Sequence, residues 1–448
     1  MSLKISRILH AGYVLECEGS KIAFDTIFEN PFSRNCYAFP SVRFDEAQIR
    51  ELKFDAVFIS HFHDDHCSFD SLNLLSREIP IYVFCVFDEL FAWLRELGFK
   101  NVFSLNLNEP VRVGSIEVIP RRALDSNVDS LFQVKAGGMN ILNVVDSWID
   151  YDTLDLLVSE GPWDLVMWPF QTMRELEVLS PSRAEPAPAT LPGEWIEQLQ
   201  TLKPRFVIPS SCQFQMESWS WYNHAFFPVT YEQFAKEVQT ALPETRVVRL
   251  NPSVSVSLDQ KSLSAAESLS WVQPVGEQNL DYDYQVNLRA PPTAEIANHF
   301  PALSAAQTEA VLKYCRQGLI EKYRSLEEPE NRYFNKARIW RLSIYDHRGQ
   351  VYSFFYNVKK NSIAAMSEAP ASELGWTTEI PIAKFFGALN EGESLTSMYV
   401  RINDTVFAPT TEKEIAEADL VEDPLVRCLF NGAFGSYQRA QLKRLLGK

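Results

Sequence analysis

The stretch that most constrains this chain is residues 61–66, which read His-Phe-His-Asp-Asp-His directly after the apolar run Ala56-Val57-Phe58-Ile59. The run is short, β-branched and aromatic, so it predicts a buried strand. In open α/β architectures, ligands collect at the carboxyl ends of such strands. Imidazole and carboxylate groups bind zinc, iron and manganese. The spacing therefore predicts a metal site, with His61 and His63 on one metal and Asp65 and His66 turned toward a second. A solvated polar loop is the alternative.

Length and composition bound the kind of protein. The 448 residues are enough for two domains, and 46% hydrophobic with 22% charged residues is typical of a globular protein. No apolar run approaches the roughly 18 to 20 residues of a membrane span. Seven cysteines without a CxxC pair favour a reducing compartment. We therefore expect a cytoplasmic protein without a membrane span.

The net charge of −16 would repel a nucleic-acid backbone. The expected partner is a small-molecule substrate, and assembly into a homo-oligomer stays open. Strands and helices alternate at short spacing up to about residue 250, which is the α/β pattern. A hairpin turn is predicted at Gly137-Gly138.

These motifs carry a resemblance to a known family. The His-x-His-x-Asp-His stretch, the opening Leu9-His10-Ala11-Gly12-Tyr13, and Asp25 at the end of the first predicted hairpin resemble the metallo-β-lactamase superfamily over residues 1–255. The opening is similar to the branch that contains the ascorbate-phosphate lactonases and the N-acyl phosphatidylethanolamine phospholipase D. The resemblance implies an α/β (α+β) fold, a four-layer αββα sandwich with the site at one edge of its two sheets.

The resemblance also implies roles for single residues. In the family, an aspartate at the position of Asp146 bridges the two metals, although Asp146 is also suited to cap a helix. Asp25 is expected to orient a ligand histidine. For His10, a site residue and a buried core histidine stay open.

Two family histidines are missing from this chain. No histidine lies between His66 and His224, and Asp125 is the nearest group able to replace the first one, unless it caps a turn. The second is expected after a strand at residues 206–209, where this chain has Ser-Ser-Cys. His224 is the candidate for that imidazole, with aromatic packing as its alternative. The predicted site residues are the metal ligands His61, His63, Asp65, His66, Asp125, Asp146 and His224, the catalytic candidates Asp65 and His10, and the supporting residues Asp25, Ser210, Ser211 and Cys212.

The function implied first is a metal-dependent hydrolase that attacks a small organic substrate with metal-activated water. Its cofactor would be one or two divalent metals, with zinc first. Replacing imidazole by carboxylate favours iron or manganese. The first alternative is therefore a non-haem di-iron oxygenase on the same fold, and the second is a binding protein that has lost catalysis.

The C-terminal part differs in character. A linker is expected over residues 256–290 and a smaller α/β domain over residues 291–448. Strands are predicted at residues 338–342, 351–358 and 398–402, and helices at residues 381–389 and 423–446. This order resembles the sterol-carrier-like domain of alkyl sulfatases.

Overall fold

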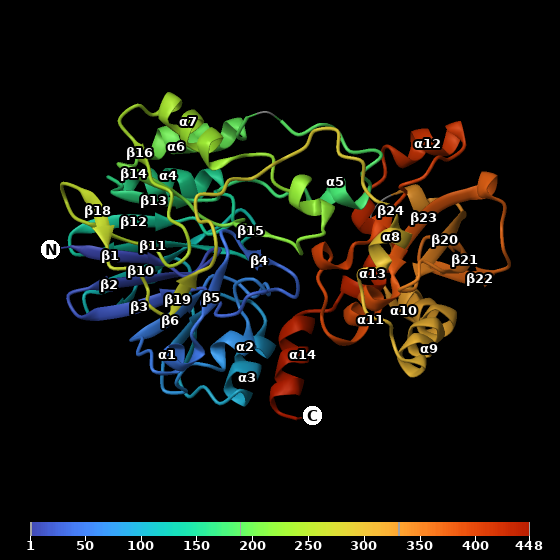
Figure 1. Ribbon diagram of the computed structural model, residues 1–448, viewed down its shortest axis with the longest axis horizontal. Coiled ribbons are helices and arrows are strands. Elements are labelled where there is room, and N and C mark those ends of the chain that lie inside the picture. Colours follow the sequence, from blue (N-terminus) through green and yellow to red (C-terminus); the bar gives the residue numbers. More distant parts are fainter. Residues whose placement is uncertain (1, 189, 330–331, 448) are drawn as a thin grey trace. The chain divides into compact units, whose positions relative to one another are not determined.

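The computed structural model describes residues 2–188, 190–329 and 332–447. The chain forms two compact units (Figure 1). The first contains residues 1–173, 187–285 and 441–448, and the second contains residues 174–186 and 286–440.

The first unit is built on two large sheets. In spatial order, the eight-stranded sheet contains β18 (Leu263–Ala266), β17 (Ser255–Leu258), β1 (Leu3–Arg7), β2 (Tyr13–Cys17), β3 (Ser20–Phe24), β6 (Ala56–Ile59), β7 (Ile81–Val83) and β8 (Val102–Ser104). The seven-stranded sheet contains β16 (Arg246–Val247), β14 (Phe206–Pro209), β13 (Leu165–Trp168), β12 (Met139–Asn143), β11 (Ser130–Ala136), β10 (Ile116–Arg122) and β9 (Val111–Val113). Two short pairs join β15 (Phe214–Gln215) to β4 (Tyr37–Ala38) and β19 (Val272–Pro274) to β5 (Val42–Phe44).

Helices cover the outer face of each sheet in Figure 1. One layer contains α1 (Glu46–Arg50), α2 (Phe69–Leu72) and α3 (Asp88–Glu96), and the other contains α4 (Tyr151–Ser159), α6 (Gly193–Leu202) and α7 (Tyr231–Ala241). Between the sheets lies a core of fully buried side chains such as Ile5, Phe58, Phe132 and Ile141. The four-layer αββα sandwich predicted from the sequence is therefore confirmed.

The expected linker over residues 256–290 differs in the structure. Residues 255–258 form β17, which pairs antiparallel with β1 so that Leu3 lies opposite Leu258. The strand looks polar in sequence because Ser255 and Ser257 alternate with apolar residues. Ser255 is nevertheless buried, and its hydroxyl donates to Ser6 Oγ at 2.7 Å. The first unit consequently extends to residue 285 rather than 255.

The second unit has its own five-stranded sheet and core. The strand order is β22 (Ser362–Met366), β21 (Val351–Lys359), β20 (Arg338–Tyr345), β23 (Leu374–Pro381) and β24 (Arg401–Ile402). Its helices are α5 (Glu175–Leu179), α8 (Thr293–Ala297), α9 (Ala305–Lys313), α10 (Leu319–Ser325), α11 (Ile382–Asn390), α12 (Pro409–Ile415) and α13 (Pro424–Phe430). Trp340 and Trp376 are fully buried in its core. The single helix expected over residues 423–446 is instead two, α13 and α14 (Ser436–Leu445), because Gly432 and Gly435 adopt left-handed conformations between them.

The last residues of α14 return to the first unit. The buried side chain of Gln441 donates to Ser68 Oγ and Asp70 Oδ2, each at 2.9 Å, and accepts the Phe69 backbone N–H at 2.7 Å. Ser68 is the N-cap of α2, and its hydroxyl accepts the Ser71 N–H. A residue near the end of the chain thus completes the start of the helix that follows residues 61–66.

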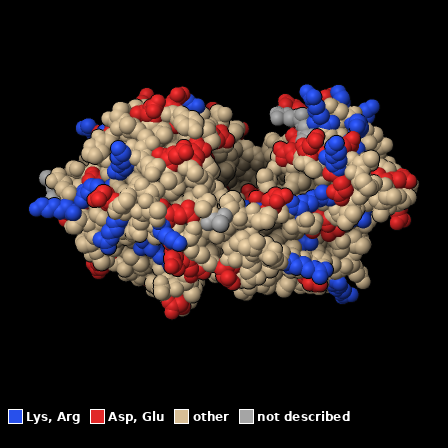
Figure 2. Space-filling view, turned by 90° about the horizontal axis from the view of Figure 1, so that it is seen from above, with Lys and Arg blue, Asp and Glu red and all other residues tan. Residues whose placement is uncertain are grey.

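Acidic and basic side chains are interspersed over the face shown in Figure 2. Within the described ranges, no helix combines the length and apolar character that crossing a membrane requires. No disulfide joins any of the seven cysteines, all of which lie in described positions.

Candidate metal centre

Four loops at one edge of the sandwich bring the site residues together. Residues 60–66 follow β6, a strand buried along its whole length. Strands β3, β6 and β7 run parallel, so their carboxyl ends share an edge of the first sheet. In the second sheet, β12 ends just before Asp146 and the antiparallel β11 begins just after Asp129. The first sheet thus contributes the histidines and Asp65, and the second contributes Asp129 and Asp146.

The first group of side chains comprises His61, His63 and Asp129, whose ligand atoms all lie within 4.8 Å of one another. His61 is buried, with Nδ1 3.0 Å from Ser60 Oγ and 3.8 Å from Asp129 Oδ1. The rings of His61 and His63 meet edge to face at 4.5 Å between centroids. His63 is exposed, so this group faces solvent on one side.

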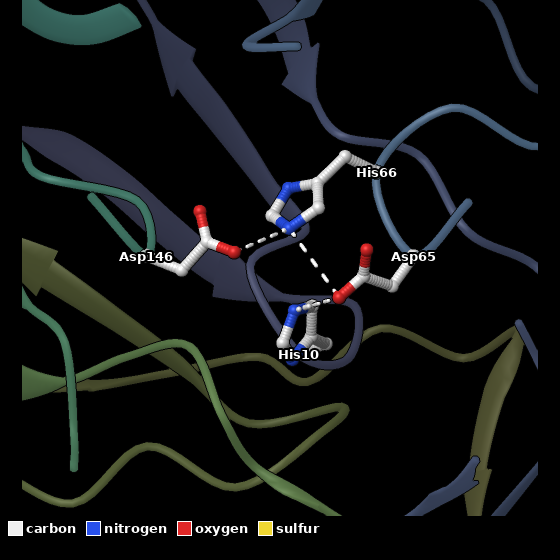
Figure 3. A group of neighbouring side chains, drawn as sticks. All are labelled: His10, Asp65, His66 and Asp146. Atoms are coloured by element: carbon white, nitrogen blue, oxygen red, sulfur yellow. Dashed lines mark hydrogen bonds and ion pairs between the residues drawn. The ribbon is translucent and has the colours of Figure 1, made fainter. Parts of the chain in front are cut away.

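The second group comprises His10, Asp65, His66 and Asp146, which point toward one another in Figure 3. His66 Nε2 lies 3.1 Å from Asp146 Oδ2 and 3.6 Å from Asp65 Oδ2. His10 Nε2 lies 3.1 Å from Asp65 Oδ2. Both histidines are buried and both aspartates are partly buried. Two imidazoles and two carboxylates therefore converge on one point.

Asp25 lies behind the second group and is fully buried. Its Oδ2 is 3.1 Å from His66 Nδ1, and its two oxygens accept the Ser60 N–H and O–H, each at 2.8 Å. A carboxylate in this position fixes the ring orientation of a ligand histidine and makes its other nitrogen more basic. Asp25 thus lies where the resemblance expects an orienting residue.

The pKa values of the buried histidines His61 and His66 are shifted in opposite directions. Burial, together with the charge on His66, lowers the pKa of His61 to about 4, so His61 is neutral at physiological pH. Burial alone would lower the pKa of His66, but the carboxylates of Asp146 and Asp65 raise it well above its ordinary value. Burial and the nearby Asp146 carboxylate raise the pKa of Asp129 to about 6. Without a metal, the His66 imidazolium provides the positive charge that these carboxylates need.

The residues fit a bound cation. His61 Nε2, Asp129 Oδ1 and Asp146 Oδ1 are buried and have no hydrogen-bond partner in the described part of the chain. Buried polar atoms are ordinarily satisfied, so unsatisfied atoms in both groups are consistent with a missing cation. Nitrogen and oxygen donors of this kind suit zinc, iron or manganese.

Two predicted ligands lie outside both groups. Asp125 is exposed, and its side chain accepts the Asn127 N–H at 3.2 Å in a turn, as its alternative role predicted. His224 lies in a short 3₁₀ helix, and its Nδ1 is 2.9 Å from the Asp283 carbonyl. Among the described residues, the two candidate groups contain Asp129 and His10 and do not contain Asp125 or His224.

The supporting residues predicted after β14 do not contact a common partner. Ser210 Oγ is 2.9 Å from the Tyr13 hydroxyl, and the Ser211 hydroxyl donates to the Val145 carbonyl next to Asp146. Cys212 is half-buried in a left-handed backbone conformation. None of these three belongs to either candidate ligand group among the described residues.

Sequence reasoning missed Asp129. Asp125 also stabilises this turn through its backbone carbonyl, which accepts the Val128 and Asp129 N–H groups. That turn sends Asp125 to the surface and brings Asp129 to the edge of the sheet at the start of β11. The available signal was position, because Asp129 lies two residues before the apolar pair Leu131-Phe132.

Two facing mixed sheets, helices on both outer faces and a His-x-His-x-Asp-His loop at one edge define the metallo-β-lactamase fold, and the first unit has this fold. No family model matches the chain. Over 152 residues it is 29% identical to the cytidine monophosphate-N-acetylneuraminic acid hydroxylase of Danio rerio and 28% identical to that of Xenopus laevis. The match covers 32% of this chain and 26% of each hydroxylase, about a quarter of their length.

Solved structures are also similar. They include Igni18, a metallo hydrolase from Ignicoccus hospitalis (17% identity, TM-score 0.42, covering 58% of this chain and all of that chain). CmlA, a diiron β-hydroxylase from Streptomyces venezuelae, shows 18% identity and a TM-score of 0.40 over 57% of this chain and 53% of CmlA. The metallo-β-lactamase fold protein YhfI from Bacillus subtilis shows 13% identity and a TM-score of 0.38 over 56% of this chain and 98% of YhfI. The lactonase and phospholipase branch stays a prediction.

Proposed function

We propose that this chain is a non-haem iron oxygenase that binds two metals and hydroxylates a small organic substrate. The observation that carries the proposal is the position of Asp129, which joins His61 and His63 as the third member of the first group. Two histidines and one carboxylate with open positions are the typical ligands of non-haem ferrous iron in oxygenases. A zinc hydrolase of this fold would present a third imidazole there.

The second group supports the same choice of metal. His10, Asp65, His66 and Asp146 add two carboxylates to two imidazoles. Carboxylates are hard donors and bring negative charge, so the whole centre favours iron or manganese over zinc. Iron bound by these residues would provide a redox-active centre for the dioxygen chemistry that C–H hydroxylation requires.

This chain's own residues have separate tasks. His61 is held neutral by burial and is ready to bind metal. His66 must lose its Nε2 proton when a metal binds, while Asp25 keeps the hydrogen bond to Nδ1 and so holds the ring. The exposed edge at His63 is the side from which substrate can reach the first group.

The proposed reaction balances with an external reductant. One C–H bond of the substrate and one O–O bond break, one oxygen atom enters the substrate as a hydroxyl, and the other leaves as water. Two electrons from a separate redox partner and two protons complete the change. The hydroxylases that match a third of this chain support an oxidative reaction. These 448 residues contain no Cys-x-His pair that would hold a Rieske cluster, so the proposed reaction takes its electrons from a reductant outside them.

The test is metal preference. Protein prepared without oxygen is offered ferrous iron and zinc in equal amounts, and bound metal is measured by elemental analysis and Mössbauer spectroscopy. We expect iron in the parent protein and zinc in Asp129→His, which restores a three-histidine site. Asp125→His is the matched control and should behave as the parent does. Zinc preference in the parent, with hydrolysis of ester, lactone or phosphodiester substrates, would replace this proposal by the hydrolase. Absence of bound metal would replace it by the binding protein.

A further inference from the structure

Arg7, the last residue of β1, has an unusual environment. Its side chain is fully buried, and no carboxylate of the described residues forms an ion pair with it. Its guanidinium instead donates to four backbone carbonyls: Nη1 to Pro209 at 2.8 Å and Leu250 at 3.1 Å, and Nη2 to Ser210 and His10. Burying a charge without a counter-ion is costly, so this arrangement calls for a reason.

The chemistry of arginine explains why this residue type is used. A guanidinium is planar and presents five donors in a rigid fork, whereas a lysine ammonium has three donors at a single point. Arg7 bonds to the strand-end segment at residues 209–210 from the second sheet and to the loop that follows β1 in the first sheet. A lysine at this position, with three donors on one nitrogen, would leave at least one of the four carbonyls without its bond.

The loop that follows β1 carries His10. Its backbone closes on itself, with the Ile8 N–H donating to the Gly12 carbonyl at 2.8 Å and the Gly12 N–H to the Leu9 carbonyl at 2.7 Å. His10 takes a left-handed conformation with φ of 47°. A side chain at Gly12 would meet the Asp25 carbonyl at 2.7 Å, so the loop lies tightly against the residue that supports His66.

A left-handed histidine is uncommon and persists only where its surroundings impose it. The bond from Arg7 to the His10 carbonyl is the contact that holds this peptide from inside the protein. From this backbone position, the His10 ring reaches Asp65 at 3.1 Å and lies 5.1 Å from the His66 ring, centroid to centroid.

We propose that Arg7 is a positioning residue for the second metal: its guanidinium fixes the backbone of His10 so that the imidazole completes the group formed by Asp65, His66 and Asp146. The inference rests on the two-metal centre proposed above. It predicts that Arg7 affects the affinity for the second metal and not for the first, because the first group contains no residue of the loop that Arg7 holds. A purely structural arginine would affect both metals alike or neither.

The test compares Arg7→Lys and Arg7→Gln with His10→Ala and the double variant Arg7→Lys/His10→Ala. Arg121→Lys is the matched control, because Arg121 is also buried but donates to the side chains of Gln133 and Asn108. Metal-free protein is titrated with ferrous iron in the absence of oxygen, and both binding steps are fitted. We expect affinity for the second metal to fall by roughly 10- to 100-fold in the Arg7 variants, with the first step unchanged. The double variant should be no weaker than His10→Ala alone.

Each other outcome overturns the inference. If the Arg7 variants bind both metals as the parent does while His10→Ala loses one, Arg7 does not position His10, and the two-metal centre stands. If the parent itself binds a single metal, the centre fails and the inference fails with it. If neither Arg7 variant folds while Arg121→Lys does, Arg7 serves the fold rather than the site.

Discussion

Asp25→Asn is the most informative single change behind the centre. The backbone of Asp25 is left-handed with φ of 40°, a conformation that asparagine tolerates well, so the change adds little strain. The amide oxygen can keep one of the two bonds from Ser60. The amide nitrogen, which is itself a donor, then replaces the oxygen that faces His66 Nδ1. The charge-assisted bond between Asp25 and His66 is therefore lost.

The magnitude follows from burial. Removing one partner of a buried, hydrogen-bonded charge pair costs about 3 to 5 kcal/mol, and the surviving bond to Ser60 places this change near about 3 kcal/mol. In a unit of this size, that corresponds to a fall in Tm of roughly 6 to 12 °C. Asp259→Asn is the control, since Asp259 accepts backbone N–H groups in an exposed turn and its change should cost under about 0.5 kcal/mol.

The loss of stability caused by Asp25→Asn should depend on pH in the metal-free protein. The folded-state pKa of His66 is raised, so the stability that its charge provides is complete below the unfolded pKa of about 6.5 and disappears as pH rises through the folded value. Denaturant unfolding of the chelator-treated protein, from about pH 6 to about pH 10, measures this. A loss smaller than about 1 kcal/mol at the lower pH, or one that stays constant across the range, would refute the reasoning.

Three further predictions concern single residues. Asp125→Ala and His224→Ala should each retain the metal content of the parent by elemental analysis, because both side chains are engaged outside the two groups. Metal affinity measured by calorimetry should fall as pH drops below about 6, because protonation of Asp129 removes a ligand from the first group. Asp423→Ala should destabilise the second unit by about 3 kcal/mol in thermal unfolding without changing metal content, because the buried Asp423 carboxylate accepts hydrogen bonds from two side chains and two backbone amides.

The sequence predicted those parts of the site that are local. His61, His63, Asp65 and His66 follow a single strand within six residues, so the strand and the spacing are enough to gather them. The αββα fold came from the resemblance that this motif carries.

Residues whose positions depend on loop conformation could not be predicted in the same way. Asp125 and Asp129 have equivalent chemistry four residues apart, and only the turn between them decides which one reaches the site. His10 was a candidate from the sequence, but its place in the second group depends on a loop contacted by Arg7, which also bonds to residues more than 200 positions away. The pairing of β17 with β1 is equally remote, so alternating serines there resembled a linker.

The return of Gln441 to α2 has a consequence for how the protein is made. During synthesis the ribosome delivers β6 and the metal-binding loop early, and the partner of Ser68 and Phe69 emerges only near the end of the chain. Until then the Phe69 N–H lacks its acceptor at the start of the helix next to His66. A fragment that stops at residue 285 would carry every candidate ligand and still lack this contact. We therefore expect α2 to reach its final stability only after residue 441 has been translated.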